Sequence, residues 1–159
     1  MDYKDLMKRA CAIALESGCV RAKVGTVIAK DGKILVEAYN RVLPTNDFCQ
    51  KHGCLRDKLG LSMGREAEKC RSIHSEARAI SKAAFKGINI KGVDVYVSFS
   101  PCMNCAKLLW SAGIKRVFYC DKHSSLASLK FLEGMGVKCE RIELEGLEVS
   151  DRLRDTDGQ

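Results

Sequence analysis

Residues 93–119, VDVYVSFSPCMNCAKLLWSAGIKRVFY, place a strand, a helix and a second strand in succession. Residues 93–99 are mostly β-branched and aromatic, which favours a strand. Pro101 is expected to open a helix, because proline is favoured at the first helical position, and Gly113 ends it. Residues 114–119 form the next predicted strand. Strand–helix–strand units of this kind build a sheet covered by helices, so the segment predicts an α/β fold.

The rest of the chain fits the same architecture. Apolar residues recur at intervals of three and four near the N-terminus, which predicts an amphipathic first helix; they are Leu6, Met7, Ala10, Ile13 and Ala14. The Asp31-Gly32 turn joins predicted strands 24–29 and 34–39 into a hairpin. Two further helices and a last strand are expected over residues 74–86, 124–135 and 137–144. We therefore predict a three-layer α/β/α sandwich with a mixed sheet.

Domain organisation is expected to be simple. The sequence contains no internal repeat or linker, so residues 1–159 are predicted to form a single domain, with a polar, loosely held tail at 145–159. Residues 40–71 show no hydrophobic periodicity and are instead rich in Pro, Gly, Asn, Cys and charged residues. A stretch of that length in a compact domain is expected to be functional or to be fixed by something else.

Composition limits the cellular setting. No apolar run reaches the length of a membrane span, and the N-terminus lacks the apolar core of a signal peptide, so we expect a cytoplasmic protein without a membrane partner. In a reducing cytosol, nine cysteines favour metal binding or catalysis over disulfides. Cys11, Cys120 and Cys139 stand alone in apolar stretches and are expected to be packing residues.

The net charge of +7 is unevenly distributed, with a basic body and an acidic tail. Such a body suits a phosphate-bearing small molecule or a nucleic acid, although many soluble domains are mildly basic.

Two short motifs carry the candidate chemistry: His74-Ser75-Glu76 and Pro101-Cys102-Met103-Asn104-Cys105. Each falls at the start of a predicted helix, where the leading side chains can face what lies beyond the helix end. Residues three apart on the first turn share a face, and the partial positive charge of a helix N-terminus favours thiolates. The two helix ends thus offer one imidazole and two thiolates.

Three protein ligands, His74, Cys102 and Cys105, leave a fourth tetrahedral position open, as at catalytic zinc sites. Zinc lowers the pKa of a bound water to around 7. Glu76, beside the metal but not bound to it, is expected to shuttle a proton from this water to a leaving amine. Cys-x-x-Cys alone would suit a zinc ribbon or a redox pair equally well. Joined to His-x-Glu in this order, it is the signature of zinc-dependent nucleobase deaminases.

At these residues the chain resembles the deoxycytidylate deaminase family. The resemblance also includes Lys23-Val24-Gly25-Thr26-Val27-Ile28 and Ala38-Tyr39-Asn40. It implies a five-stranded α/β/α core, a zinc cofactor, conversion of dCMP to dUMP with release of ammonia, and a homo-oligomer. It further implies that Asn40 contacts the sugar and that the backbone near Ser75 and Ser100 binds the base edge.

The chain departs from the family at two positions near the expected substrate. The family usually has Gly-Tyr-Asn-Gly after the second strand, whereas this chain has Arg41 after Asn40. Arg41 could bind a phosphate or be a solvated loop charge. Where the family tends to place a base-stacking Tyr, this chain has His123, which can stack less strongly.

The remaining cysteines suggest a second, structural zinc. Some family members bind one in this region, and Cys19 and Cys49 fall where its ligands would be expected. With Cys54 and Cys70 they could close a four-thiolate site, and His52 could replace one of them. The alternative is that these are unrelated buried cysteines.

Two other functions remain open. A deaminase acting on tRNA or single-stranded nucleic acid would suit the basic body, but a chain with one Trp has no cluster of aromatics for base stacking. A non-catalytic zinc scaffold would not need Glu76. The Cys102–Cys105 spacing argues against the riboflavin-pathway deaminases, whose second thiolate lies further along.

Overall fold

The computed structural model describes residues 1–62, 65–122 and 126–145. Its helices are α1 (Tyr3–Ala14), α2 (Phe48–His52), α3 (Leu55–Lys58), the 3₁₀ helix η1 (Ala67–Lys69), α4 (Ser75–Phe85), α5 (Met103–Ser111) and α6 (Ala127–Gly134). Its strands are β1 (Gly25–Lys30), β2 (Lys33–Tyr39), β3 (Arg41–Val42), β4 (Ser72–Ile73), β5 (Asp94–Phe99), β6 (Arg116–Asp121) and β7 (Lys138–Arg141). Beyond Glu145, the predicted polar tail 145–159 lies outside the described residues, as does His123.

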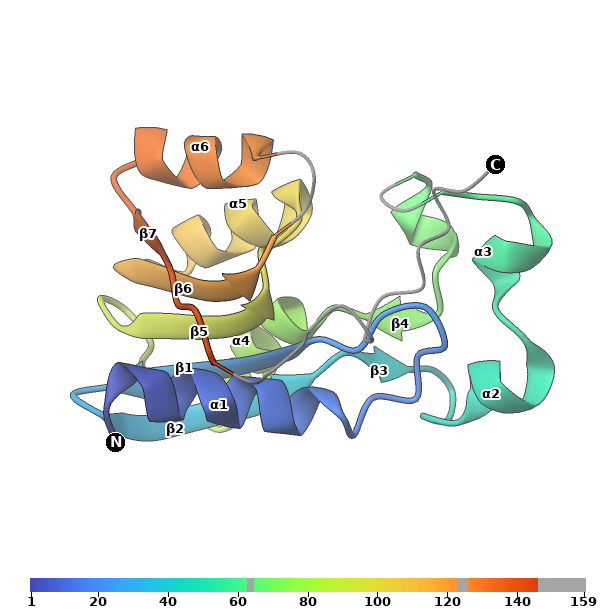
Figure 1. Cartoon of the computed structure of the whole chain (residues 1–159), viewed down its shortest axis with the longest axis horizontal. Helices are drawn as coiled ribbons and strands as arrows, with labels where there is room; N and C mark the ends of the chain where they lie inside the picture. The colour runs from blue at the N-terminus through green and yellow to red at the C-terminus, as the bar shows by residue number, and fades with distance from the viewer. Residues whose placement is uncertain (63–64, 123–125, 146–159) are drawn as a thin grey trace.

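The main sheet has five strands in the order β2-β1-β5-β6-β7 (Figure 1). The β1–β2 hairpin and the β1–β5 pair are antiparallel, whereas β5, β6 and β7 run parallel. The parallel pairs are those joined through α5 and α6, as the connection between parallel strands requires. The predicted five-stranded mixed sheet is therefore confirmed.

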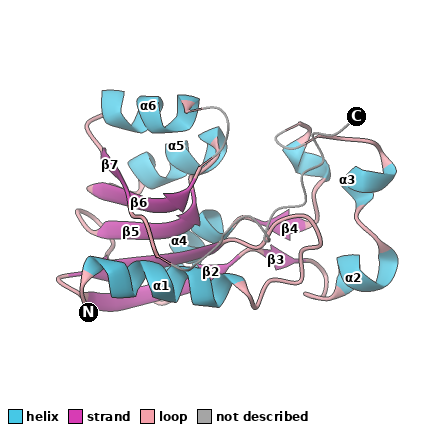
Figure 2. Ribbon diagram, viewed as in Figure 1, coloured by secondary structure: helices cyan, strands magenta, loops and turns pink. Residues whose placement is uncertain are grey.

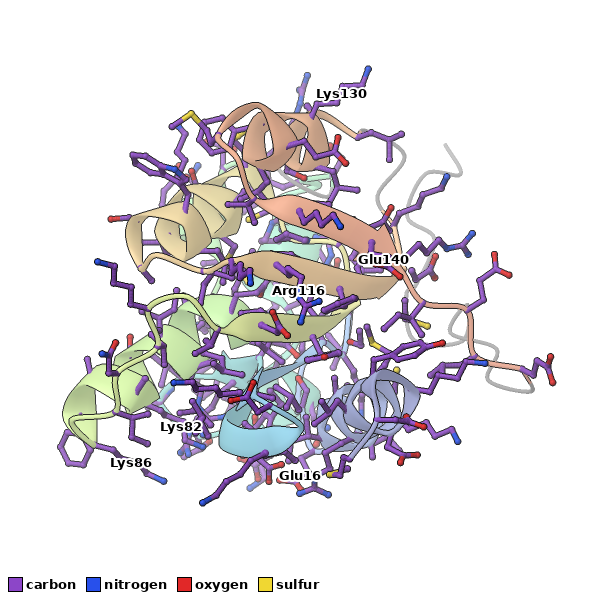
Figure 3. All side chains as sticks on the ribbon, turned by 90° about the vertical axis from the view of Figure 1, so that its left-hand side faces the viewer. Glu16, Lys82, Lys86, Arg116, Lys130 and Glu140 are labelled. Carbon is purple, nitrogen blue, oxygen red and sulfur yellow. The ribbon has the colours of Figure 1, made fainter. Side chains whose placement is uncertain are left out.

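Helices cover both faces of this sheet (Figure 2). Because side chains alternate along a strand, Val27 and Tyr96 join the core under α1, whereas Ile28 and Val97 join the core under α4 and α5. The view along the sheet shows α1 on one side and the other long helices opposite (Figure 3). Cys11 and Cys120 are both packed in the α1 core, as expected of isolated cysteines.

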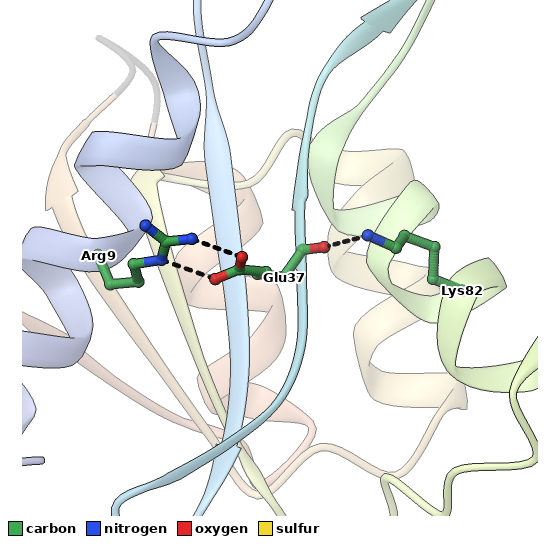
Figure 4. Close-up of polar contacts among 3 residues, drawn as sticks. All are labelled: Arg9, Glu37 and Lys82. Carbon is green, nitrogen blue, oxygen red and sulfur yellow. Dashed lines mark hydrogen bonds and ion pairs between the residues drawn. The ribbon is translucent and has the colours of Figure 1, made fainter.

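The edge strand β2 is joined to both helical layers through Glu37 (Figure 4). The Arg9 guanidinium, on α1, donates from Nε and Nη2 to the two carboxylate oxygens of Glu37 over 2.8 and 2.6 Å. From α4, Lys82 Nζ donates to the Glu37 carbonyl oxygen over 2.6 Å. Hydrogen bonding to Arg9 lowers the pKa of the Glu37 carboxyl. One residue of β2 thus fixes α1 and α4 relative to the sheet.

The stretch predicted to be irregular, residues 40–71, is partly regular. It contains the short helices α2, α3 and η1, and its β3 pairs antiparallel with β4, which immediately precedes α4. These segments lie beyond one end of the main sheet (Figure 1). Each element is too short to show a hydrophobic period, which is why the sequence pattern did not reveal them. The β3–β4 pair returns the chain to the start of α4.

Among the described residues, no helix is both long and apolar enough to cross a membrane.

Candidate metal centre and cavity

Both motifs lie at helix N-termini, as the sequence predicts. His74 is the N-cap of α4 and Glu76 its second residue; Cys102 is the N-cap of α5 and Cys105 its third residue. The two N-cap side chains face each other across the gap between the helices, with His74 Nδ1 3.5 Å from Cys102 Sγ. One detail of the prediction is wrong: Pro101 precedes the N-cap instead of opening the helix. The extended backbone of Cys102 (φ −69°, ψ 169°) delays the first turn by two residues.

The three predicted zinc ligands converge. His74 Nδ1 lies 3.5 Å from Cys102 Sγ and 3.5 Å from Cys105 Sγ. A tetrahedral zinc with Zn–S of about 2.3 Å and Zn–N of about 2.05 Å would separate nitrogen from sulfur by about 3.6 Å. Within residues 1–62, 65–122 and 126–145, this is the only set of three or more such side chains close enough to share one ion. The trio therefore fits zinc in both donor type and spacing.

The thiols influence each other's protonation. Hydrogen bonding with Cys105, and then with His74, lowers the pKa of Cys102 to about 3. The same contact with Cys102 raises the pKa of Cys105. A hydrogen bond to Cys102 also raises the pKa of the His74 imidazole. These contacts favour the thiolate form of Cys102, and thiolates are the form in which cysteine binds zinc.

Glu76 lies beside this trio in a buried, polar environment. Only 4% of its surface is exposed, and burial raises the pKa of its carboxyl. Ser75 Oγ donates to Glu76 Oε2 over 3.1 Å and lies 2.7 Å from Thr26 Oγ1. This chain of hydroxyls, anchored on β1, restrains the orientation of the carboxylate. A raised pKa suits a group that must both accept and release a proton.

His74, Glu76 and Cys102 line a cavity of about 390 Å³. Its wall is built from four stretches of chain, within residues 19–24, 40–56, 67–76 and 99–104. The last stretch follows the carboxyl end of β5, the edge at which α/β sheets commonly bind ligands. A cavity of this volume accommodates a small molecule.

The structure separates the predicted substrate-binding residues into two groups. Asn40, Ser75 and Ser100 all line the cavity, and each is buried. Asn40 Oδ1 accepts from the Val24 N–H over 2.8 Å, so its amide also fixes the cavity wall. Arg41, in β3, is not among the lining residues.

The cysteines predicted to hold a second zinc share one part of the wall. Cys19, Cys49, Cys54 and Cys70 all line the cavity, but no three of these described sulfurs reach the spacing of the first site. Burial, and then the neighbouring cysteines, raise the pKa of the Cys49 thiol. His52 does not line the cavity and instead contacts the Phe48 ring at 4.4 Å between ring centroids.

Sequence reasoning missed two kinds of residue at the site, one behind Ser75 and one in the cavity wall. Thr26 is a polar residue inside an otherwise apolar buried strand, and that irregularity could have singled it out. Four cations of the wall carried no comparable signal: Arg21, Arg56, Lys69 and Arg71. They are scattered through stretches without periodicity.

Comparison with known proteins extends these observations. A family model described as the cytidine and deoxycytidylate deaminase zinc-binding region matches residues 1–121. The deoxycytidylate deaminase of enterobacteria phage T4 is 30% identical over 154 residues, covering 77% of this chain and 79% of that protein. ComE operon protein 2 of Bacillus subtilis (strain 168) is 29% identical over 150 residues, covering 94% of this chain and 75% of that protein.

A solved structure also matches. The dCMP deaminase of cyanophage S-TIM5, in complex with dCMP and dUMP, is 27% identical and superposes with a TM-score of 0.73. The match covers 89% of this chain and 99% of the cyanophage chain.

Proposed function

Because the chain belongs to the cytidine and deoxycytidylate deaminase family, we propose that it deaminates free dCMP to dUMP with release of ammonia. The observation that carries this proposal is the convergence of His74, Cys102 and Cys105 next to a cavity that the buried Glu76 lines. The phage T4 relative is a deoxycytidylate deaminase, and the cyanophage structure binds dCMP and dUMP. Both support a cytosine nucleotide as the substrate.

The trio would hold one zinc ion, which as a Lewis acid lowers the pKa of water to about 7. His74, at the N-cap of α4, and the two cysteines, at the start of α5, come from separate helices that the sheet holds in place. Cys105 is buried and Cys102 is partly buried, so solvent access to these ligand positions is restricted.

Glu76 carries the proton transfers in this proposal. Its carboxylate takes a proton from the attacking water and gives it to the amino nitrogen that leaves C4 of cytosine. The C4–N bond breaks and a C4–O bond forms, so water and dCMP give ammonia and dUMP. Ser75 and Thr26 hold the carboxylate in one orientation throughout.

Other cavity residues would position the substrate. We assign the sugar contact to Asn40 and the base-edge contacts to the backbone near Ser75 and Ser100, all of which line the cavity. Ser75 is the first residue of α4, where a backbone N–H has no acceptor within its own helix. The Ser100 N–H donates to the Asp121 carbonyl over 2.7 Å, which fixes the backbone of Ser100 beside the cavity.

We expect dCMP to be deaminated with a higher kcat/KM than deoxycytidine by about tenfold or more, because hydrogen bonds to a charged group contribute about 1.5–3 kcal/mol. Ammonia release across nucleosides, nucleotides and oligonucleotides measures this preference. Equal kcat/KM for dCMP and deoxycytidine would contradict the monophosphate substrate. Activity confined to a single-stranded oligonucleotide would instead support nucleic-acid editing.

We also propose a second, structural zinc held by Cys19, Cys49, Cys54 and Cys70, the donor set of many structural zinc sites. The ion would draw the sulfurs together and tie residues 40–71 to the start of β1, and metal binding would then couple directly to folding. Cys54→Ser is expected to lower the melting temperature and weaken substrate binding while the catalytic zinc stays bound.

Elemental analysis tests the second zinc site. We expect two zinc ions per chain in the wild type and one per chain in Cys54→Ser. The matched control is Cys11→Ser, which buries the same hydroxyl in the α1 core, away from the cavity, and should keep both ions. One zinc in the wild type, with an unaltered melting temperature in Cys54→Ser, would leave these cysteines as packing residues.

A further inference from the structure

The cavity wall carries more positive charge than the chemistry of a neutral base requires. Four cations line it, Arg21, Arg56, Lys69 and Arg71, whereas Glu76 is the only carboxylate among the described lining residues. A concave site with one sign of charge favours ligands of the opposite sign.

Two of these cations already have acidic partners. Arg21 Nη1 lies 3.3 Å from Asp57 Oδ1, and Lys69 Nζ lies 2.9 Å from Glu66 Oε1. No comparable ion pair involves Arg56 or Arg71 within residues 1–62, 65–122 and 126–145. These two guanidinium groups are the ones that a ligand would neutralise.

Arg56 is the more unusual of the two. Only 8% of its surface is exposed, and its Nη2 donates to the carbonyl oxygens of Ser62 and Arg65. Its Nε is buried without any hydrogen-bond acceptor, the only such side-chain atom among the described residues. A buried cation without an anion, and a buried N–H without an acceptor, both cost free energy. An anion bound beside Arg56 in the cavity would offset the cost of its buried charge.

Arg71 presents its charge differently. Its guanidinium carbon lies 4.6 Å from the centroid of the Phe48 ring, which holds the group in place from α2. A guanidinium over an aromatic face keeps its in-plane N–H groups available for hydrogen bonds. Arg71 immediately precedes β4, which leads to His74, so its backbone is connected to the metal centre by two residues.

We propose that Arg56 and Arg71 bind the 5′-phosphate of the nucleotide, and so determine the preference for a monophosphate over a nucleoside. This inference rests on the proposed function. Guanidinium groups match phosphate oxygens in geometry and charge, and both residues line the same cavity as Glu76. Arg41, outside the lining, would then have no part in phosphate binding.

The test measures kcat/KM for dCMP and for deoxycytidine in Arg56→Gln, Arg56→Lys and Arg71→Gln. In both Gln variants we expect kcat/KM for dCMP to fall about ten- to hundredfold, the size of a lost charge-assisted hydrogen bond, mainly through KM. Values for deoxycytidine should stay within about twofold, because it lacks the phosphate. Arg56→Lys should retain part of the preference through its charge.

Arg78→Gln is the matched control for Arg71→Gln. The Arg78 guanidinium also lies over an aromatic ring, 4.3 Å from the Tyr39 centroid, and has no acidic partner in the described chain, but it does not line the cavity. Arg78→Gln should leave the ratio of kcat/KM for dCMP to kcat/KM for deoxycytidine unchanged. Calorimetric binding of dUMP and of deoxyuridine gives a readout independent of turnover: only dUMP should bind more weakly in the Arg56 and Arg71 variants.

Three outcomes would overturn the inference. An equal loss on dCMP and deoxycytidine in both Gln variants would indicate a structural role, and an unchanged dUMP affinity would exclude phosphate contact. Loss of the phosphate preference in Arg41→Gln alone would transfer the role to that residue. Failure of the proposed function is distinct, because it would be evident in the wild type as absent or phosphate-independent dCMP turnover.

Discussion

Replacing Glu76 by glutamine is expected to lower kcat for dCMP by about 10²–10⁴-fold, the usual contribution of a general acid–base group. Glutamine preserves the shape of the side chain and can still accept the hydrogen bond from Ser75 Oγ, but its amide cannot shuttle a proton. Because Glu76 is not one of the three converging ligands, the zinc content should remain that of the wild type. Turnover and elemental analysis on the same preparation measure both quantities.

Two variants complete this experiment. Glu37→Gln makes the same chemical change on β2, at the Arg9 contact and away from the cavity, and should keep the wild-type rate. His74→Ala removes one of the converging ligands and should lose the catalytic zinc as well as activity. A near-normal rate in Glu76→Gln with zinc bound would show that another group moves the proton.

A second large effect is expected from Gly25→Ala, at the start of β1. A Cβ at Gly25 would lie 2.1 Å from the Ala10 carbonyl oxygen, 2.7 Å from Ile13 Cγ2 and 2.8 Å from the Ala14 nitrogen. All three atoms belong to α1, so the helix would have to move away from the sheet. We expect overpacking of this kind to cost about 3 kcal/mol and to lower the melting temperature by roughly 6–12 °C.

Gly25→Ala should also lower activity, since Gly25 precedes Thr26 and its N–H donates to Ser98 Oγ over 3.0 Å. A shift of β1 would disturb the hydroxyls that orient Glu76. Gly134→Ala is the matched control: it lies in α6 with no atom within 4 Å of the added Cβ, so its stability should be equal or slightly higher. A wild-type melting temperature in Gly25→Ala would mean that α1 adjusts without cost.

The sequence alone was sufficient for the elements of the main sheet. Strands such as β5 and β6 are rich in β-branched and aromatic residues and lie close to Pro101 and Gly113, and α1 and α4 show a helical period. These signals are local, so they can be recognised without knowledge of the fold. The start of α5 was misplaced because the conformation of Cys102 depends on its site, and no local signal encodes it.

The residues of the metal centre were also identifiable from sequence, since zinc chemistry restricts the ligand types and each motif begins a helix. Their convergence is a tertiary property: His74 and Cys102 are separated by 28 positions and meet only because α4 and α5 pack on the same face of the sheet. The role of Thr26 likewise depends on strand register, which directs its side chain, like that of Ile28, toward α4.

The positive charges in the cavity wall could be identified only from the tertiary structure. Arg56 and Arg71 lie in stretches without hydrophobic period, where a charged residue is ordinarily a solvated one. Local sequence patterns cannot distinguish a solvent-exposed arginine from a buried one in these stretches. Burial in these stretches is set by contacts between segments that are far apart in sequence. The amino-acid sequence thus determined the fold class and singled out the proposed zinc ligands and proton carrier, while the packing of residues 40–71 beyond the end of the sheet determined which charges line the cavity.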